Sequence, residues 1–250
     1  RKNMTKDLTQ GKITPLLVKF TIPLLFGNIF QLMYNSVDSI IVGQLVGKEA
    51  LAAVGTSNPL MTLAILFVNG MCIGASILMG TQYGAKKMDV LKRQISTTMI
   101  AGIVFSIAVT LFCILFARPL LLLIRVQEEV LPLAVSYLRI VFLGFIFTFI
   151  YNFFACTLRA LGDSKTPLYF LVTSAFLNIF GDLFFVVVLR WGVAGSAIAT
   201  VCSEGICCLL CGIYIKKKIP LLCLGKKWWV FDKSLLGKTV SYGSTSAMQQ

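Results

Sequence analysis

Three of the ten acidic residues in this chain, Asp38, Asp182 and Glu204, lie inside long apolar stretches, whereas the others lie in loops or at helix ends. If these stretches cross a membrane, a carboxylate within them costs at least about 2.5 kcal/mol. Such a group is expected to face the protein interior or a water-filled cavity. The three carboxylates are therefore the first candidates for a functional role.

A stripe of polar side chains leads to the first of these acids. Asn28, Gln31, Asn35 and Asp38 follow one another at intervals of three, four and three residues, which places them on one face of a helix. Tyr34 lies beside this stripe. We expect the stripe to face the interior of a helix bundle, where it either lines a cavity or joins helices by hydrogen bonds.

Two polar pairs lie on either side of the short turn LRWGVAG. Asn178 and Asp182 are four residues apart, as are Thr200 and Glu204, so each pair lies on one helical face. At the helical rise, Asp182 and Thr200 lie about 15 Å and about 12 Å from the turn, and Asp38 lies about 8 to 14 Å from its own turn. We expect Asp38, Asp182 and Thr200 to converge in the outer half of a membrane. Carboxylate, amide and hydroxyl oxygens together suit a hard monovalent cation or a proton.

The elements that must position these side chains are transmembrane helices. Hydrophobic residues make up 57% of the chain and charged residues 13%, against about a quarter charged residues in a soluble domain. Apolar stretches of about twenty residues suffice to cross a hydrocarbon core of about 30 Å. The sequence therefore predicts an all-α polytopic membrane protein. We expect six spans and the start of a seventh, at 15–43, 51–82, 95–117, 130–157, 167–189, 193–215 and 237–250.

The distribution of positive charge predicts the orientation. With the amino-terminal segment 1–14 inside, 18 of the 23 Lys and Arg residues fall on the cytoplasmic side and 4 on the outside. The positive-inside rule therefore predicts a cytoplasmic amino terminus. The stretch 216–236 is basic, and we interpret it as a cytoplasmic linker between two lobes. Trp228 and Trp229 lie where an interfacial anchor is expected.

Several other functions are disfavoured by the composition. The net charge of +13 does not indicate a nucleic-acid partner, because the basic residues cluster at the ends of apolar runs. The chain has no histidine, and seven of its eight cysteines lie inside apolar runs. We therefore expect no cofactor and no transition-metal site, with cysteines packing as small apolar side chains. The sequence shows no Walker-type phosphate loop, which argues against ATP-driven transport by this chain.

Four stretches resemble the multidrug and toxic compound extrusion (MATE) family, in its bacterial DinF-like or NorM-like branches. They are IPLLFGNIFQLMYNSVDSIIVGQLVGKEALAAVG (22–55), GTQYGAKK (80–87), LRALGDSKTPLYF (158–170) and FLNIFGDLFFVVVLRWGVAGSAIAT (176–200). The resemblance covers essentially the whole chain. It implies the first six-helix lobe of a two-lobe, twelve-helix fold, with the first residues of the second lobe. It also implies a monomer in the bacterial inner membrane, whose partners are lipid, cationic drugs and the second lobe of the same polypeptide.

The resemblance further implies roles for individual residues. The matches to the family's amino-lobe cation site are Asp38, Asn178, Asp182 and Thr200. Gln31 and Tyr34 match the neighbouring cavity, and Pro23 matches a bend in the first helix. We add Asn35, Asn152 and Glu204 as cavity candidates because they are polar within apolar stretches. Glu204 lies outside the family pattern, so its role stays open.

The activity that the resemblance implies is secondary efflux, not enzymatic catalysis, with Na⁺ or H⁺ exchanged for cationic amphipathic drugs. Two neighbouring carboxylates in a low dielectric cannot both carry charge cheaply. We therefore expect a cation entering from outside to neutralise the pair, bend the first helix and shrink the cavity. A lipid-linked oligosaccharide flippase of the same fold group is one alternative, although only Arg139 is basic within a span. A membrane enzyme or scaffold is another, although no nucleophile or metal cluster is evident.

Overall fold

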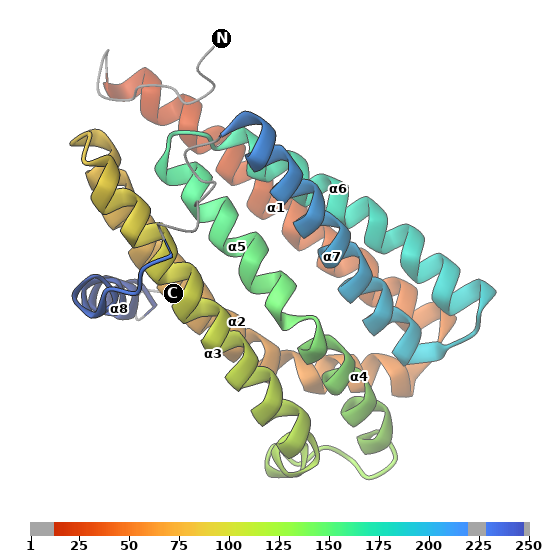
Figure 1. Ribbon diagram of the computed structural model, residues 1–250. Coiled ribbons are helices and arrows are strands. Elements are labelled where there is room, and N and C mark those ends of the chain that lie inside the picture. The colour runs from red at the N-terminus through yellow and green to blue at the C-terminus, as the bar shows by residue number, and fades with distance from the viewer. Residues whose placement is uncertain (1–12, 220–228, 248–250) are drawn as a thin grey trace.

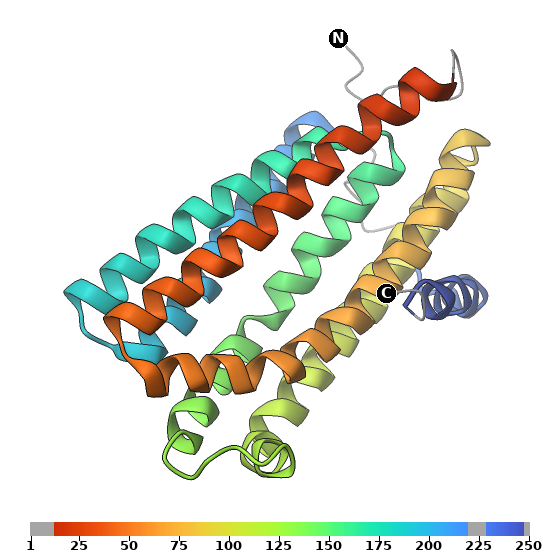
Figure 2. The ribbon, with the colours of Figure 1, turned by 180° about the vertical axis from the view of Figure 1, so that it is seen from behind.

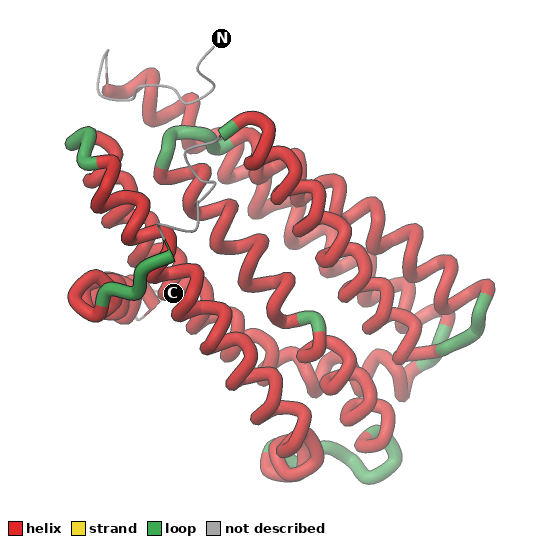
Figure 3. Tube along the Cα trace, viewed as in Figure 1, coloured by secondary structure: helices red, strands yellow, loops and turns green. Residues whose placement is uncertain are grey.

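The computed structural model describes residues 13–219 and 229–247, and every element in these ranges is helical (Figures 1 and 3). The elements are α1 (Ile13–Leu45), α2 (Lys48–Gly84), α3 (Met88–Leu123), α4 (Leu131–Leu143), α5 (Phe145–Ala160), α6 (Lys165–Asp182), η1 (Leu183–Val188), α7 (Gly192–Lys218) and α8 (Lys233–Ala247). Predictions that concern 1–12, 220–228 and 248–250 lie outside the described residues. These include most of the amino-terminal segment and the central part of the linker.

The described helices are long and apolar enough to cross a membrane. Five meet this criterion alone, and the bent pair α4 and α5 makes a sixth span when taken together. Large apolar side chains cover the outer surface, and Leu115 and Leu123 are 71% and 79% exposed. Each exposed apolar Å² is unfavourable in water by about 25 cal/mol, whereas lipid tails are as apolar as leucine. The predicted fold class, an all-α polytopic lobe, is confirmed.

Helix α5 occupies the centre of the bundle. It lies between a layer that contains α2 and α3 and a layer that contains α1, α6 and α7 (Figures 1 and 2). Its aromatic side chains Phe149 and Phe153, with Phe142 of α4, are the largest fully buried side chains of the main apolar core. Helix α1 lies at the edge of the bundle, where it packs mainly against α6.

The predicted fourth span, 130–157, is divided in the structure. Helices α4 and α5 meet at Gly144 with a bend of 47°. A Cβ atom at Gly144 would lie 2.5 Å from Cγ2 of Val201 on α7, which is much closer than an ordinary contact. The absence of a side chain at this position therefore permits the close approach of α7 to the bend.

The α6–α7 hairpin departs from the predicted regular span 167–189. After Asp182 the helix widens into η1, a six-residue π-helix; such segments are rare and often occur at functional sites. The chain then reverses through Arg190 and Gly192, whose φ angles are 56° and 58°. Glycine adopts this left-handed conformation readily, whereas arginine does so seldom. The reversal brings α7 back alongside α6 and aligns their polar faces.

Helix α8 lies across α2 and α3 instead of running alongside them (Figures 1 and 2). It begins at Lys233, a few residues before the predicted start at 237, because Asp232 Oδ1 accepts a hydrogen bond from the backbone N of Ser234 at 2.9 Å. Gln94 Nε2 of α3 donates to Thr239 Oγ1 of α8 at 2.7 Å. Gly74 of α2 contacts the α8 backbone directly. The last two contacts hold the middle of α8 against α2 and α3.

Candidate functional site

Two carboxyl groups from different helices meet in the interior of the bundle. Asp182 of α6 is fully buried and Asp38 of α1 is half-buried. Their side chains lie within hydrogen-bonding distance of each other. Ser196 of α7 donates a hydrogen bond to Asp38 Oδ1 at 3.5 Å and also reaches the carboxyl group of Asp182. Three helices thus contribute to one cluster, which we call the carboxyl pair site.

Asn178 and Thr200 extend this site by one helical turn. Asn178 is fully buried. With its amide oriented so that both polar atoms are satisfied, Nδ2 donates to Asp182 Oδ2 at 3.1 Å and the amide oxygen lies 3.1 Å from Thr200 Oγ1. The structure therefore brings the four predicted cation-site residues, Asp38, Asn178, Asp182 and Thr200, into one place.

The donor atoms of the carboxyl pair site suit a small hard cation. Asp182 Oδ1 is buried and has no hydrogen-bond partner among the described residues, although buried polar atoms nearly always have one. Carboxylate, amide and hydroxyl oxygens are the ligands that hard cations prefer. No cluster of three or more His, Cys, Asp or Glu that could hold a metal occurs in the described part of the chain. A cation bound here would therefore use the amide and hydroxyl oxygens as well as the carboxylates.

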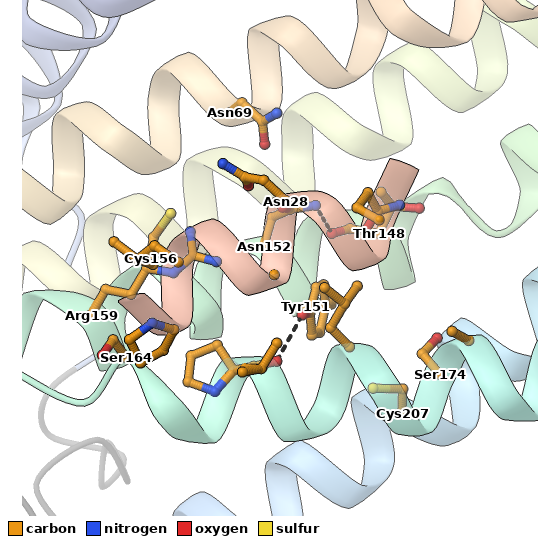
Figure 4. Close-up of a pocket in the computed structure, with 18 of the residues that line it drawn as sticks. Asn28, Asn69, Thr148, Tyr151, Asn152, Cys156, Arg159, Ser164, Ser174 and Cys207 are labelled. Carbon is orange, nitrogen blue, oxygen red and sulfur yellow. Dashed lines mark hydrogen bonds between the residues drawn. The ribbon is translucent and has the colours of Figure 1, made fainter. Parts of the chain in front are cut away.

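A separate cavity of about 530 Å³ lies between α1, α2, α5, α6 and α7 (Figure 4). Such a volume falls within the range of sites for drug-sized ligands. Its wall combines apolar side chains with amides and hydroxyls. The polar members include Asn28, Gln31, Asn69, Thr148, Asn152 and Ser174.

Glu204 is an acidic residue in the wall of this cavity. Thr148 Oγ1 of α5 donates to Glu204 Oε2 at 2.6 Å, and Asn152 Nδ2 donates to the backbone oxygen of Thr148 at 2.8 Å. Thr148 and Asn152 lie one helical turn apart on α5, so they present their polar groups to the same part of the cavity. Glu204 therefore belongs to the cavity and not to the carboxyl pair site.

The other residues predicted for the cavity divide into two groups. Gln31, Asn152 and Pro23 also line it, and α1 continues as a helix through Pro23. The side chains of Tyr34 and Asn35 lie outside the described residues. The roles of all these residues in binding or bending remain predictions.

Sequence reasoning missed several residues of both sites. Ser196 lies four residues before Thr200 on the same helical face, and this spacing could have revealed it. Tyr137 of α4 is buried in an apolar cluster with Val42 and Val193, next to the carboxyl pair site. Thr148 and Asn69 give no comparable signal, because single hydroxyls and amides are common in transmembrane helices.

Long apolar helices around interior carboxyl groups and a polar cavity define a multi-span membrane protein. A sequence profile of the MatE family matches residues 23–184. The chain belongs to this family. It is 34% identical over 211 residues to the probable multidrug resistance protein YpnP of Bacillus subtilis, covering 84% of this chain and 47% of YpnP. It is 34% identical over 242 residues to the probable multidrug resistance protein YoeA of the same organism, covering 92% and 52%.

Solved structures show the same fold. A MOP superfamily transporter from Pyrococcus furiosus superposes with a TM-score of 0.90 at 24% identity, covering 99% of this chain and 55% of that one. The chain thus spans about half the length of the curated relatives and solved structures that it matches. This is the share expected for one lobe of a two-lobe fold.

Proposed function

We propose that this chain forms the first lobe of a secondary active efflux transporter of the bacterial inner membrane. The transporter exchanges Na⁺ or H⁺ for amphipathic organic cations and is not an enzyme. The observation that carries the proposal is the carboxyl pair of half-buried Asp38 and buried Asp182, which lies beside amide and hydroxyl oxygens. Relatives named as probable multidrug resistance proteins support drug export as the activity.

Neutralisation of the carboxyl pair supplies the driving step of the mechanism. Two carboxylates so close together in a low dielectric repel each other, so a proton or Na⁺ stabilises their approach. Ser196, Asn178 and Thr200 supply the remaining polar contacts. Cation binding therefore favours the arrangement in which α1 and α6 are drawn together, and cation release favours their separation.

Helix α1 connects this step to the cavity. It carries Asp38 toward one end and the cavity residues Pro23 and Gln31 further along. Most of its described side chains are exposed or half-buried, and its main partner within the bundle is α6. Pro23 lacks the backbone N–H that would bond to the preceding turn, which eases bending there. A change in α1 at Asp38 thereby alters the wall of the cavity.

The flippase alternative has less support from the cavity. A pyrophosphate group would need several basic side chains. Among the described lining residues only Arg159 is basic, and Glu204 lies in the same wall. The cavity therefore favours a cationic ligand over a polyanionic one.

Reconstitution of the full-length protein tests the proposal. Proteoliposomes would be loaded with ethidium, and efflux would be driven by an imposed Na⁺ gradient or pH gradient in separate experiments. We expect Asp38→Asn and Asp182→Asn to abolish gradient-driven efflux, because each removes one charge from the pair. Glu49→Gln, an exposed acid at the start of α2, serves as the matched control. Wild-type rates in both Asn variants would exclude the carboxyl pair as the coupling site.

A further inference from the structure

Glu204 lies apart from the carboxyl pair site. On α7 it follows Thr200 by four residues and Ser196 by eight, so it lies about 6 Å and about 12 Å from them along the helix axis. Glu204 lines the cavity, whereas neither Asp38 nor Asp182 is among the described lining residues. The coupling step proposed above therefore leaves this third interior carboxylate without a role.

No basic side chain of the described cavity wall is placed to neutralise Glu204. Among the described residues that line the cavity, Arg159 alone is basic. It lies on α5 eleven residues after Thr148, the hydrogen-bond partner of Glu204, which corresponds to about 16 Å along the helix. Arg159 is exposed at the end of α5. The two charges therefore lie at opposite ends of the cavity, too far apart for an ion pair.

The carboxylate of Glu204 is also held in place. Thr148 donates to Oε2 at 2.6 Å, and no described residue donates to Oε1. Thr148 is itself fixed on α5 next to Asn152, whose amide bonds to its backbone oxygen at 2.8 Å. An oriented carboxylate with one oxygen unbonded, in the wall of a cavity of about 530 Å³, is a binding group for a positive charge.

We propose that Glu204 is the anionic anchor of this cavity and binds the cationic head of an amphipathic ligand, an organic ammonium or phosphonium ion. The apolar body of the ligand lies against Ile65, Ile73, Leu168 and Leu171, which line the same cavity. This inference rests on the proposed function, because the ligand is the exported cation. It assigns ligand charge selection to Glu204, while ion coupling belongs to Asp38 and Asp182.

Two probes of the same shape and opposite charge test this assignment. Tetraphenylphosphonium and tetraphenylborate carry four phenyl groups each but differ in the sign of their charge. Binding of both would be measured by equilibrium dialysis with the purified full-length protein in detergent. Protein-free detergent gives the correction for partitioning. The variants are Glu204→Gln, which removes the charge, and Thr148→Val, which keeps the charge but removes its hydrogen-bond donor. The matched control is Glu49→Gln.

The expected result is a change in charge selectivity. Glu204→Gln should weaken tetraphenylphosphonium binding by about tenfold to a hundredfold, as is typical when an interaction with a charged group is lost. Tetraphenylborate binding should stay the same or become tighter. Thr148→Val should weaken tetraphenylphosphonium binding by only about three- to tenfold, and Glu49→Gln should change neither. Wild-type tetraphenylphosphonium binding by Glu204→Gln, or an equal loss for both probes, would overturn the assignment.

The same preparations separate this assignment from the proposed function. Suppose that wild-type protein transports no ethidium under either gradient, while Glu204→Gln weakens binding of tetraphenylphosphonium but not of tetraphenylborate. Glu204 is then the anionic anchor, and the proposed coupled efflux is wrong. If wild-type protein transports ethidium and Glu204→Gln binds both probes like wild type, coupled efflux is supported and the assignment of Glu204 as the anchor is wrong. Equal elution volume and thermal midpoint of the variant and wild-type proteins would exclude misfolding as the cause.

Discussion

Gly74 lies where α2 and α8 approach each other closely, and replacing it by alanine should push the two helices apart. A Cβ atom there would lie 2.4 Å from the backbone oxygen of Thr239, 2.6 Å from the backbone N of Gly243 and 2.9 Å from its Cα. All three are backbone atoms, so no side-chain rotation can relieve the overlap. An ordinary contact begins at 3.4 Å, which requires α8 to move by about 1 Å.

The energetic effect of Gly74→Ala follows from this displacement. It stretches the hydrogen bond from Gln94 Nε2 to Thr239 Oγ1, which is 2.7 Å long and buried, beyond bonding distance. Weakening a buried hydrogen bond costs about 1–3 kcal/mol, and overpacking costs about 1–3 kcal/mol. Alanine within a helix offsets about 0.5–1 kcal/mol of this loss. We expect a net destabilisation of about 1–5 kcal/mol. In a full-length chain of about twice this length, each kcal/mol lowers the thermal midpoint by about 1–2 °C.

Thermal unfolding of the full-length protein in detergent, followed by tryptophan fluorescence, provides the assay. Gly55→Ala is the control, because Gly55 lies exposed on the same helix with nothing within 4 Å of its added Cβ. The same substitution should there leave the midpoint unchanged or raise it by a few degrees. If Gly74→Ala unfolds at or above the wild-type temperature while Gly55→Ala behaves as expected, α8 is not displaced by the added methyl group.

Three further outcomes are expected. Ser196→Ala should raise the half-saturating Na⁺ or H⁺ concentration for dye efflux about three- to tenfold, because the serine hydroxyl donates a hydrogen bond to the carboxyl pair. An unchanged half-saturating concentration would show that Ser196 does not contribute to that site. Asp163→Ala should lower the thermal midpoint by about 2–4 °C, because Asp163 Oδ1 accepts from the backbone N of Lys165 and Thr166 at the start of α6. Lys86 is exposed, so the cysteine of Lys86→Cys should react with a membrane-impermeant maleimide in inside-out vesicles only. Labelling of this cysteine in intact cells would show that the orientation is opposite to the predicted one.

The sequence was sufficient to predict the helices but not their interruptions. Long apolar stretches identify spans because membrane thickness sets their length. The break at Gly144 depends on Val201 of α7, which packs where a side chain would otherwise lie. The π-helix after Asp182 likewise leaves no mark in the hydropathy profile, because all of its residues are apolar. Both features arise from contacts between helices, and one-dimensional periodicity carries no information about them.

The carboxyl pair could be predicted because charged groups are rare at membrane depth, and two of them on helices that pack together are expected to share a polar pocket. The assignment of Glu204 and Thr200 to two different sites could not be predicted from the sequence. The two residues are four apart and share a helical face, yet Thr200 contacts Asn178 of α6 whereas Glu204 contacts Thr148 of α5. Successive turns of α7 meet different neighbours, and only the bundle geometry decides which.

The π-helix after Asp182 has a consequence for the tolerance of this region to changes in length. Each residue of a π-turn advances around the axis by a smaller angle than in an α-turn, so Leu183–Val188 can gain or lose a residue by changing its winding. The rotational phase of Asp182 and Asn178 is set by the regular helix before that segment. Insertions or deletions beyond Asp182 would then change the direction of the turn before α7, while the side chains of Asn178 and Asp182 keep theirs.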